Sequence, residues 1–367
     1  MRKLQWIAVG SAVLVIAAAA IVWFSPSAQD AVLRRVAARQ LRAPLSPPPS
    51  TTAIRLVFCG TGSPLPDRHV AKSCLAVFAG GRFFVVDTGP ESTENLLLWR
   101  LPLAKIDGVL LTHFHSDHMG ELGELNLQSW LQGRRAPLAV YGPPGVEEVV
   151  SGFNLAYAQD KAVRHAHHAR DRGLLPLSAS TLASRAITVG AEGPLSGTES
   201  AVMYDQDGLR IIAFKVDHGV VKPAYGYRFD YRGRSVVVSG DTRSTSLIAN
   251  AARGADVLVH EAQSKALVST LSAVAKESGN RQVSLLLGDT NDYHTTPAEA
   301  AALANAAGVR ELVFTHFTPP SSNPLVKRAF FRDVDAVRPK HWRAAEDGLW
   351  LDVSAEAGAL QTGLVGR

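Results

Sequence analysis

After residue 52 the chain alternates short apolar runs with polar turns that contain glycine, a pattern that predicts strands. The predicted strands lie at residues 54–58, 75–78, 83–86, 109–112, 210–216, 224–229, 235–238, 257–259 and 311–314. Apolar positions at helical spacing predict helices near 94–99, after Met119 and at 297–307. This mixture of elements indicates an α/β fold that opens with a three-stranded meander.

The first thirty residues carry a different pattern, because they are almost continuously apolar from Leu4 to Phe24 behind two basic residues. Such a run is long enough to span a bilayer. We therefore expect residues 1–30 to form an uncleaved signal anchor, with a signal peptide cleaved near Ala28 as the alternative. A linker is expected at 31–52, and within it the prolines of residues 43–52 prevent regular structure.

The rest of the chain is expected to form one folded domain at 53–355 and a C-terminal tail at 356–367. We expect this domain to lie in the periplasm, held to the inner membrane by the anchor, or released there after cleavage. The positive-inside rule argues against export, because the two basic residues before the apolar run are outnumbered by four arginines after it, at Arg34, Arg35, Arg39 and Arg42.

Composition restricts the kinds of function that the chain can have. The 367 residues are 46% hydrophobic and 19% charged, so the chain can bury a large core. Its formal net charge of +5 is spread along the sequence and gives only weak support for a nucleic-acid or anionic-membrane partner. Only Cys59 and Cys74 are present, and they fit either a disulfide across neighbouring strands or two buried thiols.

The strongest chemical signal is the segment His113-Phe-His115-Ser-Asp117-His118, which directly follows a predicted strand. Neutral imidazole and carboxylate oxygen are ligands that zinc takes. His113 and His115 would face one ion if the chain turns here, while Asp117 and His118 would serve a second, as in two-metal hydrolases. A solvated histidine-rich loop is the structural alternative.

Three more candidate ligands follow predicted strands in the second half of the chain, namely His218, Asp241 and His316. Taken alone, each fits a hydrogen-bonded core residue. Their shared position after a strand favours a site at one rim of a sheet scaffold, where loops carry function.

These residues resemble the metallo-β-lactamase superfamily, and within it the ribonuclease Z and metal-dependent arylsulfatase branch. The motifs that carry the resemblance run from about residue 54 to about 320, at residues 60–64, 87–89, 113–118, 218, 225–228, 240–242, 260–262, 294–296 and 315–317. The resemblance implies an αβ/βα sandwich of two mixed sheets flanked by helices, with a metal site at one edge.

The resemblance also implies a ligand set for two Zn²⁺ ions per chain. One ion would be held by His113, His115 and His218, the other by Asp117, His118 and His316, and Asp241 would bridge both. The implied nucleophile is a bridging hydroxide, because two zinc ions lower the pKa of a shared water. Asp117 would also orient that hydroxide.

Further roles are expected around this centre. His294 corresponds to the histidine that supplies a proton to the leaving group in this branch, since an imidazole suits proton transfer near neutral pH. Glu261 would hold His294, and Asp87 would support the ligand loop by hydrogen bonds. Structural alternatives are a surface histidine for His294 and a polar group at a strand end for Glu261.

The sequence departs from the ribonuclease Z pattern in two ways that bear on the substrate. Only about twenty residues separate His218 from Asp241, so the long arm that clamps tRNA is missing, and the last motif continues as Phe317-Thr-Pro-Pro. We therefore expect a small anionic ester, a phosphodiester or a sulfate ester, in preference to tRNA. Two basic clusters are candidate substrate contacts if they lie near the site, namely Arg164 with His167 and His168, and Arg68 with His69 and Lys72.

Alternative functions remain open. The same site would serve a lactonase or a β-lactamase, and a membrane-anchored zinc-binding protein without catalysis would need the ligands but not His294. A diiron redox enzyme of this superfamily usually has glutamate where this chain has His115. Membrane contact through the N-terminal helix and a homodimer are further expected associations.

Overall fold

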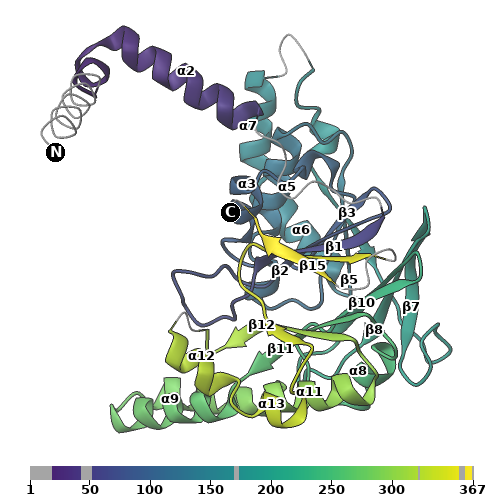
Figure 1. The fold of residues 1–367 in the computed structure, drawn as a ribbon. Helices are drawn as coiled ribbons and strands as arrows, with labels where there is room; N and C mark the ends of the chain where they lie inside the picture. The colour runs from purple at the N-terminus through teal and green to yellow at the C-terminus, as the bar shows by residue number, and fades with distance from the viewer. Residues whose placement is uncertain (1–18, 43–51, 169–172, 321–322, 355–359, 366–367) are drawn as a thin grey trace, which may run out of the picture. The chain divides into compact units, whose positions relative to one another are not determined.

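The protein is described from a computed structural model, which covers residues 19–42, 52–168, 173–320, 323–354 and 360–365 (Figure 1). The chain divides into two compact units, one up to Leu45 and one from Ser46 onward.

The first unit contains α2 (Pro26–Arg42). Most of the predicted membrane anchor, residues 4–18, lies outside the described residues. Within the described ranges, no helix has both the length and the apolar character needed to cross a membrane. Residues 31–42 of the predicted linker are helical, because alanine, leucine, arginine and glutamine are good helix formers and the prolines of the linker begin only at Pro44.

The second unit contains two sheets. The first has eight strands in the order β15-β14-β1-β2-β3-β4-β5-β6. Its strands are β1 (Ala53–Gly60), β2 (Cys74–Ala79), β3 (Arg82–Val86), β4 (Gly108–Leu110), β5 (Leu138–Gly142), β6 (Leu182–Ala186), β14 (Leu349–Ser354) and β15 (Gln361–Leu364). The first three form the predicted antiparallel meander, while β3 to β6 run parallel. The predicted tail is corrected here, because β15 pairs with β14 and belongs to the sheet.

The second sheet has seven strands in the order β13-β12-β11-β10-β9-β8-β7. Its strands are β7 (Ser200–Gln206), β8 (Leu209–Lys215), β9 (Tyr225–Tyr231), β10 (Arg234–Val238), β11 (Val257–Gln263), β12 (Glu311–Thr318) and β13 (Trp342–Ala344). Strands β10 to β13 are parallel, whereas β7 to β10 are joined in antiparallel pairs. The carboxyl ends of β10, β11 and β12 therefore meet at one edge of this sheet.

Alternation along the strands places one apolar core between the sheets and one on each outer face. Ile54, Leu56 and Phe58 of β1 pack in the central core with residues of the second sheet, whereas Val57 and Cys59 face the outer side of the first sheet. Figure 1 shows the helices on the two outer sides. This arrangement confirms the predicted sandwich of two mixed sheets flanked by helices.

The helices fall into two groups by their place in the chain. The first group contains α3 (Ser92–Leu98), α4 (Ser116–Met119), α5 (Leu122–Leu131), α6 (Val146–Ala156) and α7 (Ala158–His168). The second contains α8 (Ser246–Ala251), α9 (Lys265–Glu277), α10 (Arg281–Asp289), α11 (Pro297–Ala306), α12 (Pro324–Phe330) and α13 (Val334–Val337). A disulfide joins Cys59 of β1 to Cys74 of β2, so the pairing left open by the sequence is present.

Candidate metal centre

The histidine-rich segment leaves the sheet at the end of β4 and turns into the short helix α4. His115 is the residue that caps this helix, and Asp117 and His118 lie within its single turn. The turn brings the rings of His115 and His118 to 4.6 Å and 4.1 Å from the His113 ring. The local change from strand to helix is therefore what gathers these side chains.

The second sheet supplies the remaining candidate ligands. Asp241 follows β10 through Gly240, whose φ is +61°. A Cβ atom at Gly240 would lie 2.7 Å from the carbonyl oxygen of Tyr225 and 3.0 Å from Cβ of Thr112. Glycine is required here because the turn uses a left-handed conformation in a crowded place. His316 lies in β12 and has a φ of +50°, a conformation uncommon for histidine.

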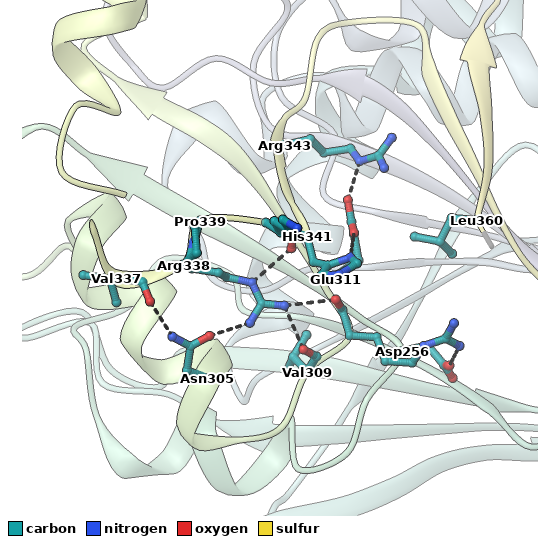
Figure 2. Close-up of a pocket in the computed structure, with 12 residues that line it drawn as sticks. Asp256, Asn305, Val309, Glu311, Val337, Arg338, Pro339, His341, Arg343 and Leu360 are labelled. Carbon is teal, nitrogen blue, oxygen red and sulfur yellow. Dashed lines mark hydrogen bonds and ion pairs between the residues drawn. The ribbon is translucent and has the colours of Figure 1, made fainter. Parts of the chain in front are cut away.

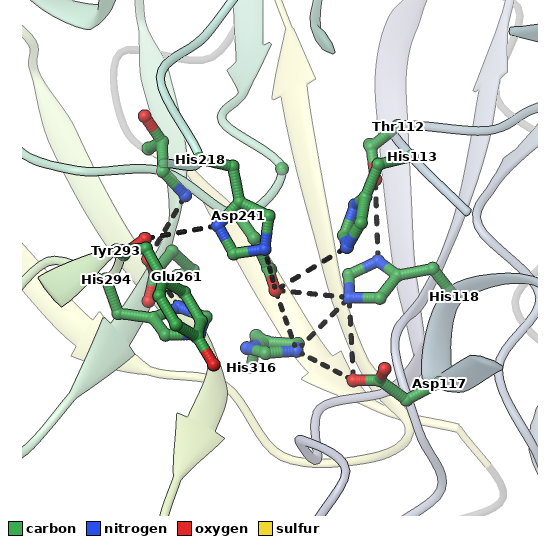
Figure 3. Close-up of polar contacts among 12 residues, drawn as sticks. Thr112, His113, Asp117, His118, His218, Asp241, Glu261, Tyr293, His294 and His316 are labelled. Carbon is green, nitrogen blue, oxygen red and sulfur yellow. Dashed lines mark hydrogen bonds and ion pairs between the residues drawn. The ribbon is translucent and has the colours of Figure 1, made fainter. Parts of the chain in front are cut away.

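All seven side chains that the sequence marked as ligands meet at one place, shown in part in Figure 3. Oδ2 of Asp241 is the centre of the group, at 3.3 Å from Nε2 of His118 and 3.4 Å from Nε2 of His316. The same oxygen lies 3.9 Å from Nε2 of His218 and 4.0 Å from Nε2 of His113. Asp241 thus stands between ligands from both halves of the chain.

The donor atoms form overlapping sets suited to cations. The two sets that the sequence implied are both present, His113 with His115 and His218, and Asp117 with His118 and His316, each with its ligand atoms within 4.8 Å of one another. Among the described residues, Nε2 of His113 and Nε2 of His218 have no hydrogen-bond partner although they are buried. Buried polar atoms without partners are uncommon, so these orphaned nitrogens fit a divalent cation.

Protonation states also suit metal binding. Burial lowers the pKa of His113 well below its ordinary value and that of His218 to about 4, so both rings are neutral at pH 7. Burial would raise the pKa of Asp241, but His316 and His118 outweigh it and hold that pKa well below its usual range. For His118 the carboxylates of Asp241 and Asp87 outweigh burial and raise the pKa, so a cation must displace a proton there.

Asp87 supports the ligand loop from the end of β3. Its Oδ2 lies 2.8 Å from Nδ1 of His118, and its Oδ1 accepts a hydrogen bond of 2.8 Å from the backbone N–H of Thr112. The Thr112 hydroxyl also donates to Asp87, at 2.9 Å. A carboxylate on Nδ1 leaves Nε2 of His118 facing the centre, as a metal-binding tautomer requires.

His294 and Glu261 form a second buried pair at the rim of the centre. Nδ1 of His294 lies 3.0 Å from Oε1 of Glu261, which also accepts the backbone N–H groups of Thr242 and Thr295, at 3.2 Å and 3.1 Å. His294 is 7% exposed, so the surface alternative is wrong. Burial lowers the pKa of His294, but the Glu261 carboxylate outweighs burial and leaves the pKa raised. This pair can hold a proton at Nε2 toward the centre.

The two basic clusters differ in position. Arg164 lies on α7, where it pairs with Asp160 at 2.8 Å, and α7 packs against α6 and the turn at Leu177–Ala179. None of the contacts described for α7 reaches the ligand group. His69 lies on the loop after β1 and lines a cavity of about 330 Å³ that also includes Phe317, the neighbour of His316. His69 of the second cluster therefore shares a cavity with the neighbour of a candidate ligand.

Two neighbours of the centre were missed by sequence reasoning. Thr112 links His113 and His118 to Asp87, with its hydroxyl 3.1 Å from Nδ1 of His113. The Tyr293 ring lies 5.1 Å from the His218 ring and 4.9 Å from the His294 ring. Their signal was adjacency in sequence, since each directly precedes a marked histidine.

A different polar cavity, of about 750 Å³, lies at the opposite end of the parallel strands (Figure 2). Its lining residues include Asp256 just before β11, Glu311 at the start of β12 and Arg343 in β13. The larger cavity is thus remote from the candidate ligands, and its lining residue Arg338 directs its donors at protein acceptors.

Residues 82–317 match the model of the beta-lactamase superfamily domain. Ribonuclease Z from Mycolicibacterium paratuberculosis and ribonuclease Z from Mycobacterium bovis are each 35% identical to the chain over 269 residues, which is 72% of this chain and 86% of the relative. Among solved structures, human tRNase Z, short form, is similar with a TM-score of 0.56 and 20% identity, over 82% of this chain and 99% of that one. The metallo-beta-lactamase fold protein YhfI from Bacillus subtilis is similar with a TM-score of 0.55 and 18% identity, over 85% of this chain and 100% of that one.

Proposed function

The chain belongs to the metallo-β-lactamase superfamily, with ribonuclease Z among its relatives, and on this premise we propose that it is a two-zinc hydrolase of phosphodiester bonds. One observation carries the proposal. A single carboxylate oxygen of Asp241 lies within 4.0 Å of imidazole nitrogens from four histidines, which lie in or shortly after strands of both sheets. A carboxylate in that position suits a ligand shared by two ions.

The proposed ligands are those implied by the sequence. His113, His115 and His218 would hold one ion, and Asp117, His118 and His316 the other, with Asp241 common to both. When bound, zinc supplies a water of lowered pKa for nucleophilic attack and positive charge beside the ester oxygens. Asp117 and Asp241 bring two negative charges that offset part of the charge of the ions.

His294 is proposed as the proton donor to the leaving oxygen. Its Nδ1 is held by Glu261, so its Nε2 is the atom available to a substrate. Glu261 also accepts hydrogen bonds from two backbone N–H groups, which keep its carboxylate in place beside the ring. Glu261 is therefore a positioning residue, and it acts on the reaction only through His294.

Phosphodiesters are the first choice of substrate, since two relatives are named ribonuclease Z. Between His218 and Asp241 the chain is occupied by β9 and β10, which leaves no room for a long arm. The short connection supports a small anionic diester. RNA is the second candidate, and the identity of 35% to ribonuclease Z favours it. Sulfate esters, lactones and β-lactams are the alternatives that an assay must include.

A substrate panel on the full-length, zinc-loaded protein tests the proposal. The panel contains bis(p-nitrophenyl) phosphate, p-nitrophenyl sulfate, a lactone, a β-lactam and a precursor tRNA. We expect the phosphodiester to be hydrolysed and expect removal of metal by a chelator to abolish turnover. Zinc-loaded protein that turns over none of the five compounds would support a metal-binding protein without catalysis and contradict the proposal.

We further propose that the hydrolase domain is exported and held to the inner membrane by its N-terminal apolar segment. The disulfide between Cys59 and Cys74 supports this, because disulfides persist in oxidising compartments. Alkylation of free thiols in intact cells, followed by mass spectrometry, measures the state of both cysteines. An oxidised pair in the membrane fraction is expected, whereas free thiols in a soluble fraction would contradict export.

A further inference from the structure

Tyr293 faces the candidate metal centre and has no role in the function proposed so far. Its ring covers two members of the site, with centroids 5.1 Å from His218 and 4.9 Å from His294. In Figure 3 the hydroxyl end of the ring extends past His294 toward the side on which His316 lies. The side chain is half-buried, so one part packs and another part is open to a bound molecule.

Three contacts fix the position of the chain at Tyr293. Nδ1 of His218 lies 3.1 Å from the carbonyl oxygen of Tyr293, which fixes the ring of a ligand and the position of the tyrosine together. Nε of Arg243 donates to the carbonyl oxygen of Asp292 at 2.5 Å. A Cβ atom at Gly219 would lie 2.9 Å from Cβ of Tyr293, so glycine is needed for this close approach. The phenol is therefore positioned before any substrate arrives.

The hydroxyl is the part of Tyr293 that packing does not explain. Within the described part of the chain it makes no hydrogen bond, although the buried Tyr225 and Tyr227 each donate to a carbonyl oxygen, at 2.9 Å and 2.7 Å. A hydrogen-bond donor fixed at the rim of a site for anionic esters can stabilise the negative charge that develops in the transition state.

We propose that the Tyr293 hydroxyl donates a hydrogen bond to a non-bridging oxygen of the substrate ester in the transition state. The inference rests on the proposed phosphodiester hydrolysis and adds a residue that contacts the substrate. No proton is transferred in this role, because the phenol keeps its hydrogen throughout. His294 delivers the proton to the leaving oxygen, while Tyr293 stabilises charge on an oxygen that stays with the phosphorus.

The test compares Tyr293→Phe with the unchanged full-length protein, both loaded with zinc. The phenylalanine ring keeps the packing on His218 and His294 and removes only the donor. We expect kcat on bis(p-nitrophenyl) phosphate to fall roughly 10²-fold, the lower end for one lost oxyanion donor, with little change in KM. Zinc content and the melting temperature should stay unchanged. A kcat within about twofold of the unchanged protein, an interval well below that donor range, would overturn the inference.

Tyr204→Phe is the matched control. Tyr204 is also half-buried, its hydroxyl is buried without a hydrogen-bond partner among the described residues, and it lies on β7 against Phe84. The same loss of one oxygen there should leave kcat unchanged. A fall in kcat of equal size in both variants would show that the effect comes from a general loosening of the fold, and it would overturn the inference.

A binding measurement separates this inference from the proposed reaction. Inorganic phosphate is titrated calorimetrically into zinc-loaded protein and into zinc-loaded Tyr293→Phe. The oxygens of free phosphate carry the charge that the ester oxygens develop only in the transition state, so we expect affinity to fall about tenfold in the variant, which corresponds to one hydrogen bond to a charged group. A protein that turns over no phosphodiester yet shows this fall would refute the reaction and support the contact. Equal affinities, or loss of zinc in the variant, would overturn the contact.

Discussion

Two buried polar clusters occupy opposite ends of the same parallel strands, and they differ in whether the protein satisfies its own polar atoms. The candidate metal centre lies where β10, β11 and β12 end, and the Arg338 cluster lies where β11, β12 and β13 begin. Both hold charged side chains that are more than nine-tenths buried. Burying such groups is costly unless they are paired, so each cluster needs an explanation.

The Arg338 cluster is complete without any ligand (Figure 2). Its guanidinium donates to the carbonyl oxygens of His341, Val309 and Arg310 and to Oδ1 of Asn305, over distances from 2.7 to 3.0 Å. Val309 and Arg310 lie in the segment between α11 and β12, so Arg338 holds that connection in place. The cluster is therefore structural.

The metal centre has the opposite character. Nε2 of His118 and Nε2 of His316 lie 3.2 Å apart, and the Asp117 and Asp241 carboxylates converge on the same region. The buried nitrogens of His113 and His218 have no partner among the described residues. Groups that crowd together yet leave atoms unsatisfied indicate a place suited to a cation. Completeness of hydrogen bonding, more than burial or charge, therefore distinguishes the structural Arg338 cluster from the candidate metal centre.

The largest difference between the two clusters is expected on substitution of Asp241. Asp241→Ala should reduce phosphodiesterase activity to the uncatalysed level and remove most of the zinc, because the shared ligand is lost. The matched control is Asp256→Ala, a carboxylate equally buried in the Arg338 cluster, where it pairs with Arg310 at 2.8 Å. That variant should keep its zinc and its kcat. Metal analysis and initial rates on both variants give the result, and retention of two zinc ions by Asp241→Ala would contradict the assignment.

His294 tests whether the rim of the centre acts in chemistry without binding metal. His294→Ala should lower kcat roughly 10²- to 10⁴-fold, the usual range for a lost general acid, while zinc content stays the same. Glu261→Gln should give a smaller loss, because the ring remains but is less firmly held. Loss of zinc equal to that of Asp241→Ala would show that His294 is a ligand and refute its assigned role.

The Arg338 cluster should respond in stability alone. Arg338→Met should lower the free energy of unfolding by roughly 2–4 kcal/mol, since several buried acceptors lose their donor. Urea denaturation measures this change, and steady-state kinetics should show kcat and KM unaltered. A change in kcat at unchanged stability would mean that the two ends of the sheet are coupled, and the contrast drawn here would fail.

The smallest effect is expected at Asp87, which supports a ligand without touching the ion. Asp87→Asn should weaken zinc affinity about 10- to 100-fold, because an amide holds Nδ1 of His118 less well than a carboxylate. Competition with a chromophoric chelator measures the affinity. Asp107→Asn is the control, since Asp107 accepts the backbone N–H of Phe83 at 2.8 Å in a similar way. Equal weakening in both variants would count against a specific role for Asp87.

Much of the centre could be predicted because its parts carry local signals. The segment 113–118 and Asp241 follow apolar strands, His316 follows the apolar first half of β12, and parallel strands end at one edge. The same reasoning located the opening meander and the helix that became α11. Short motifs after buried strands are determined by the sequence near them, so no long-range contact had to be known.

The rest depends on contacts between distant parts of the chain. Arg338 reaches Asn305 over 33 positions, and His218 reaches the Tyr293 carbonyl over 75, so neither contact has a local pattern. Strand β15 is half-exposed and becomes a strand only by pairing with β14. The helices α9 and α10, which no spacing argument predicted, pack on each other. The formation of these elements therefore depends on tertiary contacts, which the local sequence pattern does not show.

The central claim is that seven side chains hold two metal ions around Asp241. The most direct measurement is the ratio of zinc to protein in the purified chain, by elemental mass spectrometry, before and after the single change Asp241→Asn. We predict two zinc ions per chain in the unchanged protein and a clear loss in the variant, in parallel with activity. Full activity at a ratio of one or below, or an unchanged ratio in the variant, would contradict the account.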